Sequence, residues 1–171
     1  EIELFKNLRI DLTANRSYSS NYNESFQVSN NQYIAQNPNL FGNFSISSNM
    51  ISTSFNKRNL LFSLDFENLK KNRKIIANRL IQTKNLIDIQ YDSNGYPIGY
   101  GRNSQAVLIP SFIAAYTGIN PAKISLDPIS DKPKLNWSLQ FDGLNEVFED
   151  IFSRISLQHG YRSNFTINQF N

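Results

Sequence analysis

The sequence contains no cysteine, which excludes a disulfide framework and any thiolate metal site. Charged residues make up only 18% of the chain, below the roughly 25% of ordinary globular domains. The net charge of +3 is too small to indicate a nucleic-acid partner. No apolar run approaches the roughly 18 residues of a transmembrane helix. A membrane β-barrel is not excluded by this last absence, because the polar face of its strands offsets the apolar face in hydropathy.

Catalytic signatures are lacking as well. None of the many serines lies in a G-x-S-x-G motif, and the glycines of residues 95–101 are not followed by the GK[ST] of a phosphate-binding loop. The single histidine, His159, has apolar strand neighbours, which favours packing or a position at a membrane interface over general-base catalysis. The acids Glu146, Glu149 and Asp150 fall on the polar side of a short expected helix, where solvation is their ordinary role. We therefore expect no enzyme activity and no cofactor or bound metal.

What the chain does have is aromatic content of 13% and alternation near its end. Within residues 152–170, every second residue from Ile155 is mostly apolar and the intervening residues are polar apart from a glycine, which predicts one long strand with two different faces. The apolar set is Ile155, Leu157, Tyr161, Phe165 and Ile167. The polar set is Ser156, Gln158, Arg162, Asn164 and Thr166. Such a strand exceeds the usual 5–6 residues and suits a tilted membrane strand of roughly 9–11, although a long edge or hairpin strand of a soluble sheet fits the same pattern.

The beginning of the chain alternates in the same way. Residues Ile2–Leu12 carry apolar side chains at nearly every even position, and the phase continues to Val28. We expect one long strand, or two strands joined near Asn15–Ser20. Residues Asn30–Asn43 contain Pro38 and Gly42 and are expected to form a loop.

Two further strands are expected. Residues Phe44–Phe55 alternate, but the phase flips near Ser48–Met50, which predicts a bulge or a change of face. Residues Asn136–Phe141 place three bulky apolar side chains, including Trp137, on one face.

The spacing of apolar residues changes to three and four between residues 62 and 81, which predicts an amphipathic helix. Ser63 or Asp65 is expected to cap its start. The polar face is basic and carries Lys70, Lys71, Lys74 and Arg79. These residues suit contact with a partner or with anionic lipid headgroups, and they equally suit a solvated face of a packed helix.

The most apolar run predicts a second helix at residues 106–117, with Pro110 at its start or at a kink and Gly118 as its stop. It is too short to cross a bilayer, so a buried helix or a re-entrant, plug-like segment is expected. A short third helix is expected at residues 144–151.

Both ends of the sequence lie inside or near strand patterns, and residue 1 is Glu, so we expect a piece of a longer polypeptide. Five to seven strand segments are fewer than the 8 of the smallest membrane barrels, so these strands would not close a barrel alone. We expect residues 1–171 to belong to one barrel domain with four parts. These are strands and a loop at 1–60, a basic amphipathic helix insert at 61–84, a loop, helix and proline-rich insert at 85–135, and strands with a short helical insert at 136–171.

Several phrases of the sequence resemble one protein family in the same order over nearly the whole chain. They are LRIDLTANRSYS, FGNFSIS, ENLKKNRKIIANRL, GYPIGYGR, QAVLIPSFIAAYTG, NWSLQFDGL and ISLQHGYRSNFTINQF. They look like the SprA/Sov family, the outer-membrane translocons of the type IX secretion system in Bacteroidota. Ser111 and Ser138 depart from the residues usual at their places, and the likeness covers only a small part of a family protein.

The resemblance implies a mainly β fold: a fragment of a very large transmembrane antiparallel β-barrel, with inserted helices, in the cell outer membrane. It implies a protein-conducting lumen that exports folded cargo proteins, gliding and adhesin proteins included. The implied partners are a PorV-like shuttle barrel protein, a periplasmic plug protein and secreted cargo with C-terminal signals. In such a wall, the apolar set of residues 155–167 would face outer-membrane lipid and the polar set would face the lumen.

Two competing classes remain open at the level of the sequence. One is a soluble, secreted β-rich binding module or adhesin, with aromatic residues such as Trp137 as binding platforms. The other is a membrane barrel for a different cargo, such as lipopolysaccharide.

Overall fold

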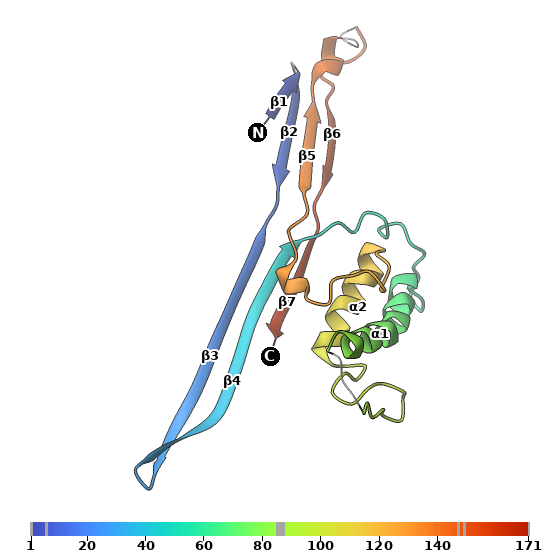
Figure 1. Ribbon diagram of the computed structural model, residues 1–171. Coiled ribbons are helices and arrows are strands. Elements are labelled where there is room, and N and C mark those ends of the chain that lie inside the picture. The colour runs from blue at the N-terminus through green and yellow to red at the C-terminus, as the bar shows by residue number, and fades with distance from the viewer. Residues whose placement is uncertain (1, 6, 85–87, 147, 149, 171) are drawn as a thin grey trace. The chain divides into compact units, whose positions relative to one another are not determined.

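The computed structural model describes residues 2–5, 7–84, 88–146, 148 and 150–170. These residues form two antiparallel sheets, two α-helices and two short 3-10 helices (Figure 1). The chain divides into two compact units: residues 1–49 with 132–171, here called the β unit, and residues 50–131, here called the helical unit. The expectation of a mainly β chain with inserted helices is confirmed.

The first sheet of the β unit has the strand order β1-β2-β5-β6, and every neighbouring pair is antiparallel. The strands are β1 (Ile2–Phe5), β2 (Leu8–Thr13), β5 (Asn136–Phe141) and β6 (Leu157–Tyr161). β5 matches its expected bounds. The expectation that residues 2–12 lie in one strand is wrong, because the chain turns at Asn7 with a φ of 71° and β1 folds back on β2. The alternative of two strands joined near Asn15–Ser20 agrees better, since β2 ends at Thr13 and the next strand begins at Arg16.

The second sheet has the strand order β3-β4-β7 and is also antiparallel. Its strands are β3 (Arg16–Ser29), β4 (Gln32–Ser47) and β7 (Asn164–Phe170). The loop expected over residues 30–43 is therefore wrong. Only Asn30 and Asn31 form the turn, with φ values of 51° and 60°, and asparagine tolerates this left-handed region better than most residues.

A β-bulge explains why the pattern of β4 is not legible in the sequence. Asn23 pairs with Asn39 and Ser25 pairs with Gln36, so Glu24 faces two residues of β4, 37 and 38. The extra residue shifts the alternation of β4 by one position. Pro38 lies at this bulge, where proline is tolerated because no ladder hydrogen bond from its nitrogen is required.

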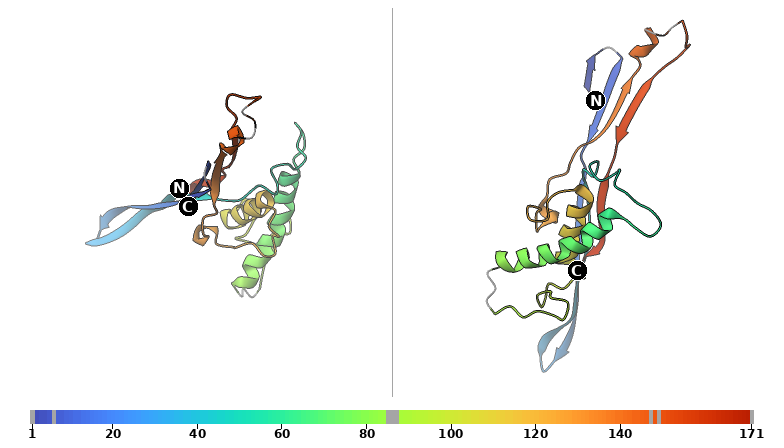
Figure 2. Two further views of the ribbon diagram at one scale, coloured as in Figure 1. Left: turned by 90° about the horizontal axis from the view of Figure 1, so that it is seen from above. Right: turned by 90° about the vertical axis from the view of Figure 1, so that its right-hand side faces the viewer.

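Each long ribbon of the β unit passes through both sheets. β2 continues into β3 through residues 14–15, and β6 continues into β7 through residues 162–163 (Figure 2). The strand expected over residues 152–170 thus starts at Leu157 and is divided between two sheets. β5 lies between β2 and β6, and β4 lies between β3 and β7, so β4 and β5 are two halves of one middle ribbon.

The middle ribbon is interrupted by the helical unit. The strand expected over residues 44–55 ends at Ser47, and residues 51–55 form turns instead. The chain returns to the sheet at Asn136, the first residue of β5. No bulge is needed near residues 48–50, because the strand has already ended.

The helical unit contains α1 (Leu64–Thr83) and α2 (Gln105–Thr117), which pack against each other. Both expected helices are confirmed within two residues at each end. Ser63 caps α1, because its hydroxyl accepts a hydrogen bond from the amide of Phe66 at 3.4 Å. Gly118 ends α2 with a φ of 72°.

Two 3-10 helices complete the described chain: η1 (Pro128–Ser130) and η2 (Gly143–Glu146). η2 occupies the start of the helix expected at residues 144–151, and the Phe148 amide donates to the Leu144 carbonyl at 3.1 Å. Val147 and Glu149 of that expected helix lie outside the described residues.

Candidate functional site

The first sheet separates apolar from polar side chains almost completely. Residues directly opposite each other in a sheet share a face. Three rows cross β2, β5 and β6 on one face: Leu8, Phe141 and Leu157; Ile10, Leu139 and His159; Leu12, Trp137 and Tyr161. The rows on the other face include Arg9, Gln140 and Gln158, and Asp11, Ser138 and Gly160. We call the first of these surfaces the apolar face and the second the polar face.

None of the nine side chains of the apolar face is buried. Leu12 is 49% exposed and Leu157 is 54% exposed. In a globular protein a sheet buries its apolar side under a second layer. This face is therefore apolar without a covering layer, which distinguishes it from an ordinary core surface.

Three aromatic side chains gather at one end of the apolar face. The rings of Trp137 and Tyr161 lie 4.8 Å apart, and those of Trp137 and His159 lie 6.2 Å apart in a stacked arrangement. The indole N–H of Trp137 donates a hydrogen bond of 3.2 Å to Nδ1 of His159. His159 is thus exposed and packed against an aromatic neighbour, and it has no carboxylate within this cluster.

The second sheet repeats the separation of faces. Tyr18, Phe44 and Ile167 form one apolar row, while Ser17, Ser45 and Thr166 form a polar row on the opposite side. The hydroxyls of Ser45 and Thr166 lie 3.1 Å apart, within hydrogen-bond distance. The same two-sided character therefore extends along both sheets of the β unit.

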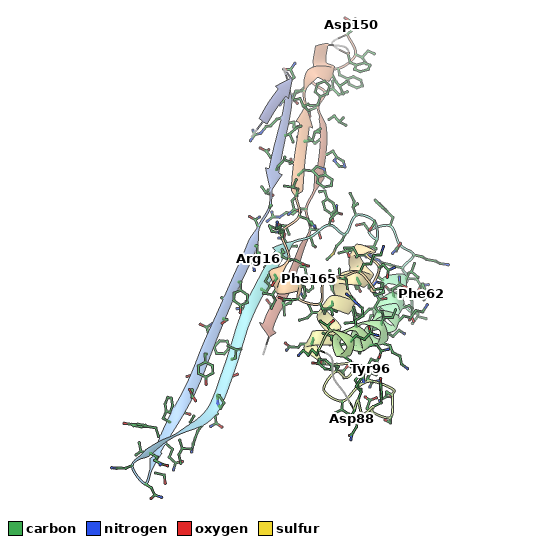
Figure 3. The ribbon with its side chains drawn as sticks, in the orientation of Figure 1. Arg16, Phe62, Asp88, Tyr96, Asp150 and Phe165 are labelled. Atoms are coloured by element: carbon green, nitrogen blue, oxygen red, sulfur yellow. The ribbon has the colours of Figure 1, made fainter. Side chains whose placement is uncertain are left out.

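The apolar side of the second sheet is buried at the end next to residues 14–15 and exposed further along the strands. Phe44 is 0% exposed and Phe165 is 9% exposed, and the Arg16 guanidinium lies 6.0 Å from the centre of the Phe44 ring (Figure 3). Tyr18 and Tyr22 are exposed further along β3. β3 and β4 continue past the end of β7 as a two-stranded ribbon whose large side chains are mostly exposed.

The residues expected to face lipid are thus separated by the structure. Leu157 and Tyr161 belong to the apolar face of the first sheet, while Phe165 and Ile167 belong to the apolar side of the second. Ile155 precedes β6 and is half-buried. Phe165 is not part of the exposed apolar surface. The residues expected to face the lumen are all exposed: Ser156, Gln158, Arg162, Asn164 and Thr166.

A buried polar cluster, here called the polar junction, lies where the middle ribbon is interrupted. Ser47, Ser48 and Asn136 are all at least nine-tenths buried. The Ser47 amide donates to the Asn15 carbonyl at 2.8 Å, and the Ser48 amide donates to the Ser163 carbonyl at 3.0 Å. Oδ1 of Asn136 accepts from the Ser163 amide at 3.0 Å. The three ribbons are therefore joined at the point where the helical unit leaves the sheet.

The helical unit leaves and returns at almost the same place. The Lys134 amide donates to the Ser47 carbonyl at 2.8 Å, so the ends of the inserted segment are neighbours in the sheet. This geometry is that of an insertion into one strand, which a sheet tolerates when its own hydrogen bonds are restored at the insertion point.

The four basic residues expected on one face of α1 have different surroundings. Lys70 pairs with Glu67 at 2.7 Å and lies 5.4 Å from the centre of the Phe66 ring. Lys71 and Lys74 are exposed. Arg79 points inward, and its guanidinium donates to two carbonyls of the loop after α2, at 2.7 and 2.9 Å. Arg79 is therefore a structural residue of the helical unit and does not join the exposed basic face.

Asp65, the alternative cap expected for α1, has a similar structural role. Its side chain is 0% exposed and accepts hydrogen bonds from Asn56 at 2.5 Å and Arg58 at 2.9 Å. These contacts fasten the preceding turn to the first turn of the helix. As an acid in the first turn it also complements the helix dipole.

Sequence reasoning missed the polar junction and a group of asparagines in the helical unit. The signal for the asparagines was present, since Asn68 and Asn72 are four residues apart and share one side of α1. The junction left no local signal, because its members come from four separate segments of the chain.

Among the described residues, no three histidine, aspartate or glutamate side chains are grouped so that they could hold a metal ion. Neither α1 nor α2, the helices of the described chain, is long and apolar enough to cross a membrane. A scan against models of protein families finds no match, and a search of curated proteins finds no similar sequence.

Proposed function

We propose that this chain supplies wall strands of a very large antiparallel β-barrel in the outer membrane, and that the barrel conducts proteins to the cell surface. The observation that carries this proposal is the uncovered apolar face of the first sheet, directly opposite a polar face on the same strands. In lipid this face needs no covering layer, whereas in water an apolar patch of this kind requires a partner.

The lengths of the strands support the same conclusion. β3 has 14 residues and β4 has 16, and both exceed the roughly 9–11 residues of a tilted strand that crosses the hydrocarbon core. An isolated two-stranded ribbon is marginally stable in water. β3 and β4 nevertheless continue past the end of β7 as such a ribbon. Further strands beside them would complete the hydrogen bonding.

The open edges give a second line of support. Among the described strands, β1 and β6 lie at the edges of the first sheet, and β3 and β7 lie at the edges of the second. A strand edge that faces lipid would leave its backbone groups unsatisfied. In the proposed barrel, strands from outside residues 1–171 pair with these edges.

The polar face suits the inner wall of a protein channel. Ser138, Gln140, Gln158 and Gly160 are uncharged, and the two charged residues of this face, Arg9 and Asp11, pair with each other at 3.3 Å. Such a surface stays hydrated without binding charged cargo strongly. In this proposal Gln158, Asn164 and Thr166 face the lumen, and Leu12, Leu139 and Leu157 face lipid.

The resemblance to the SprA/Sov family supports the choice of cargo. In this proposal the barrel is the type IX secretion translocon, and it acts with a PorV-like shuttle barrel, a periplasmic plug and cargo proteins that carry C-terminal signals. The described strands would form part of its wall, and the helical unit would be an insertion into one wall strand.

Cysteine labelling tests the wall assignment, because the chain has no native cysteine. Two adjacent pairs serve as mutual controls: Leu157→Cys with Gln158→Cys on β6, and Leu139→Cys with Ser138→Cys on β5. In outer-membrane fractions, the cysteine on the polar face should react with a water-soluble maleimide. The cysteine on the apolar face should react only with a lipid-dissolved maleimide.

Equal labelling of both members of each pair by the water-soluble reagent would contradict the proposal. The alternative is a secreted β-rich adhesin, which the half-buried, tilted ring pair of Trp137 and Tyr161 favours as a binding platform. An adhesin would be recovered outside the membrane fraction, with both positions of each pair accessible from water.

A further inference from the structure

The helical unit contains a groove of about 440 Å³, within the size range of sites that hold small ligands. The turn at residues 52–56, α1 and the end of α2 with its following loop form its walls. Its polar lining consists of Ser52, Thr53, Asn56, Asn68, Asn72 and Asn120, and its lining also includes the small residues Ala114, Ala115 and Gly118. No charged and no aromatic side chain lines the groove.

Two of the asparagines lie one helical turn apart on α1. Within the described residues the side-chain amide group of Asn68 has no hydrogen-bond partner, so its side-chain carbonyl and its amino group are both available. Asn72 uses only its amino group, which donates to the Ser111 carbonyl at 3.5 Å. Its side-chain carbonyl has no partner in the described part of the chain.

The other two asparagines offer complementary groups. Asn56 donates through its amino group to the buried Asp65, which leaves its side-chain carbonyl unpaired among the described residues. Asn120 accepts from the Ala122 amide at 2.8 Å through its carbonyl, which leaves its amino group unpaired among the same residues. Arg79 holds the loop that carries Asn120, so this wall of the groove is fixed.

We propose that this groove binds a polypeptide segment in extended conformation through its main chain. The unpaired groups are a mixture of neutral donors and acceptors, which is the chemistry of peptide N–H and C=O groups. A strongly charged ligand would find no charged side chain in the lining to neutralise it. A nucleobase would find no aromatic side chain for stacking.

The spacing of Asn68 and Asn72 fits such a segment. Four residues of an α-helix rise about 6 Å. Two residues of an extended strand advance about 6.6–6.8 Å, and residues two apart direct their main-chain groups to the same edge. The two amides can therefore pair with alternate residues of one extended peptide.

The source of the peptide rests on the proposed function: an extended tail or linker of the exported polypeptide would be the ligand. The chemistry of the groove itself does not depend on membrane insertion. A negative result in the peptide-binding experiment would contradict the groove, and a negative result in the cysteine-labelling experiment would contradict the wall assignment. Each result can therefore be interpreted without the other.

The test uses the complete chain in detergent and a short fluorescent peptide of glycine, serine and threonine, followed by fluorescence anisotropy. The peptide should bind, and the same peptide with N-methyl groups at alternate residues should not, because it lacks the N–H donors. Asn68→Ala should weaken binding about 2- to 10-fold, the effect of one or two hydrogen bonds. Alanine favours the helix, so this variant should remain folded.

Asn78→Ala is the matched control, since Asn78 is exposed on the same helix and does not line the groove. It should bind the peptide as the wild type does. The proposal is overturned if the wild type does not bind the peptide or if both variants weaken binding equally. Equal binding of the N-methylated peptide, or full displacement of the peptide by a neutral oligosaccharide, would also overturn it.

Discussion

At the scale of single residues, the neighbours Leu157 and Gln158 test the proposed assignment of faces most directly. They are consecutive on β6 and project to opposite faces of the first sheet. In the proposed barrel, a charge introduced at Leu157 enters lipid, whereas a charge introduced at Gln158 enters the water of the lumen.

We therefore expect Leu157→Arg to destabilise the assembled protein by about 2–4 kcal/mol if the position lies near mid-bilayer. Gln158→Arg should be nearly neutral, because arginine on the lumen side stays hydrated. Urea unfolding of the protein in lipid vesicles measures both. Equal costs at the two positions would remove the assignment of faces.

Asp65 is a residue whose importance comes from burial. Asp65→Ala should lower the free energy of unfolding by about 2 kcal/mol, because two hydrogen bonds to a buried carboxylate are lost and Asn56 is left without its acceptor. Far-ultraviolet circular dichroism during urea unfolding follows this change, since both α-helices of the described chain lie in the helical unit.

Glu67→Ala is the control for Asp65, since Glu67 is also an acid in the first turn of α1. Its pair with Lys70 is exposed to solvent, so its loss should cost at most about 0.5 kcal/mol. If the two substitutions had the same effect, the helix dipole rather than the buried contacts would explain the role of Asp65.

At the scale of elements, the β3–β4 hairpin depends on a tight turn and a bulge. Asn30 and Asn31 both have positive φ, the requirement of a type I′ turn between antiparallel strands. Asparagine adopts this conformation at low cost, and glycine adopts it more readily.

Asn31→Gly should accordingly leave stability unchanged or raise it slightly, whereas Asn31→Val should cost about 1–2 kcal/mol. Hydrogen exchange of the amides in β3 and β4 measures the local effect. Faster exchange in the glycine variant than in the valine variant would contradict the assigned turn geometry.

The helices illustrate how far local pattern reaches. α1 and α2 agree with their expected bounds because their apolar spacing, the Ser63 cap and the Gly118 stop all lie within a few residues of one another. By contrast, residues 32–43 of β4 are part of an expected loop, because Pro38 and the shifted phase at the bulge hide the alternation there.

At the scale of the whole molecule, the helical unit is inserted into the middle ribbon of the β unit. The insertion begins and ends beside one hydrogen bond, between the Lys134 amide and the Ser47 carbonyl. Each sheet has its own ladder of hydrogen bonds on either side of this point.

Replacement of residues 50–131 by a short glycine-serine linker should therefore leave the β unit able to assemble. In the excised chain, the labelling contrast between Leu157→Cys and Gln158→Cys should persist while peptide binding is lost. Asn136→Ala in the intact chain is the comparison, and we expect it to disturb assembly more, because it removes contacts of the polar junction. An excised chain that no longer assembles would show that the insertion supports the sheet.

The alternation of residues 8–13, 136–141 and 157–161 was sufficient to predict strands with one apolar and one polar face, because side-chain direction in a strand depends only on position along the chain. The helical spacing of residues 64–83 was sufficient for α1 in the same way. The division of the long ribbons between two sheets, the insertion of the helical unit and the polar junction were decided by tertiary structure alone. Each depends on hydrogen bonds between residues distant in sequence, such as Ser48 with Ser163.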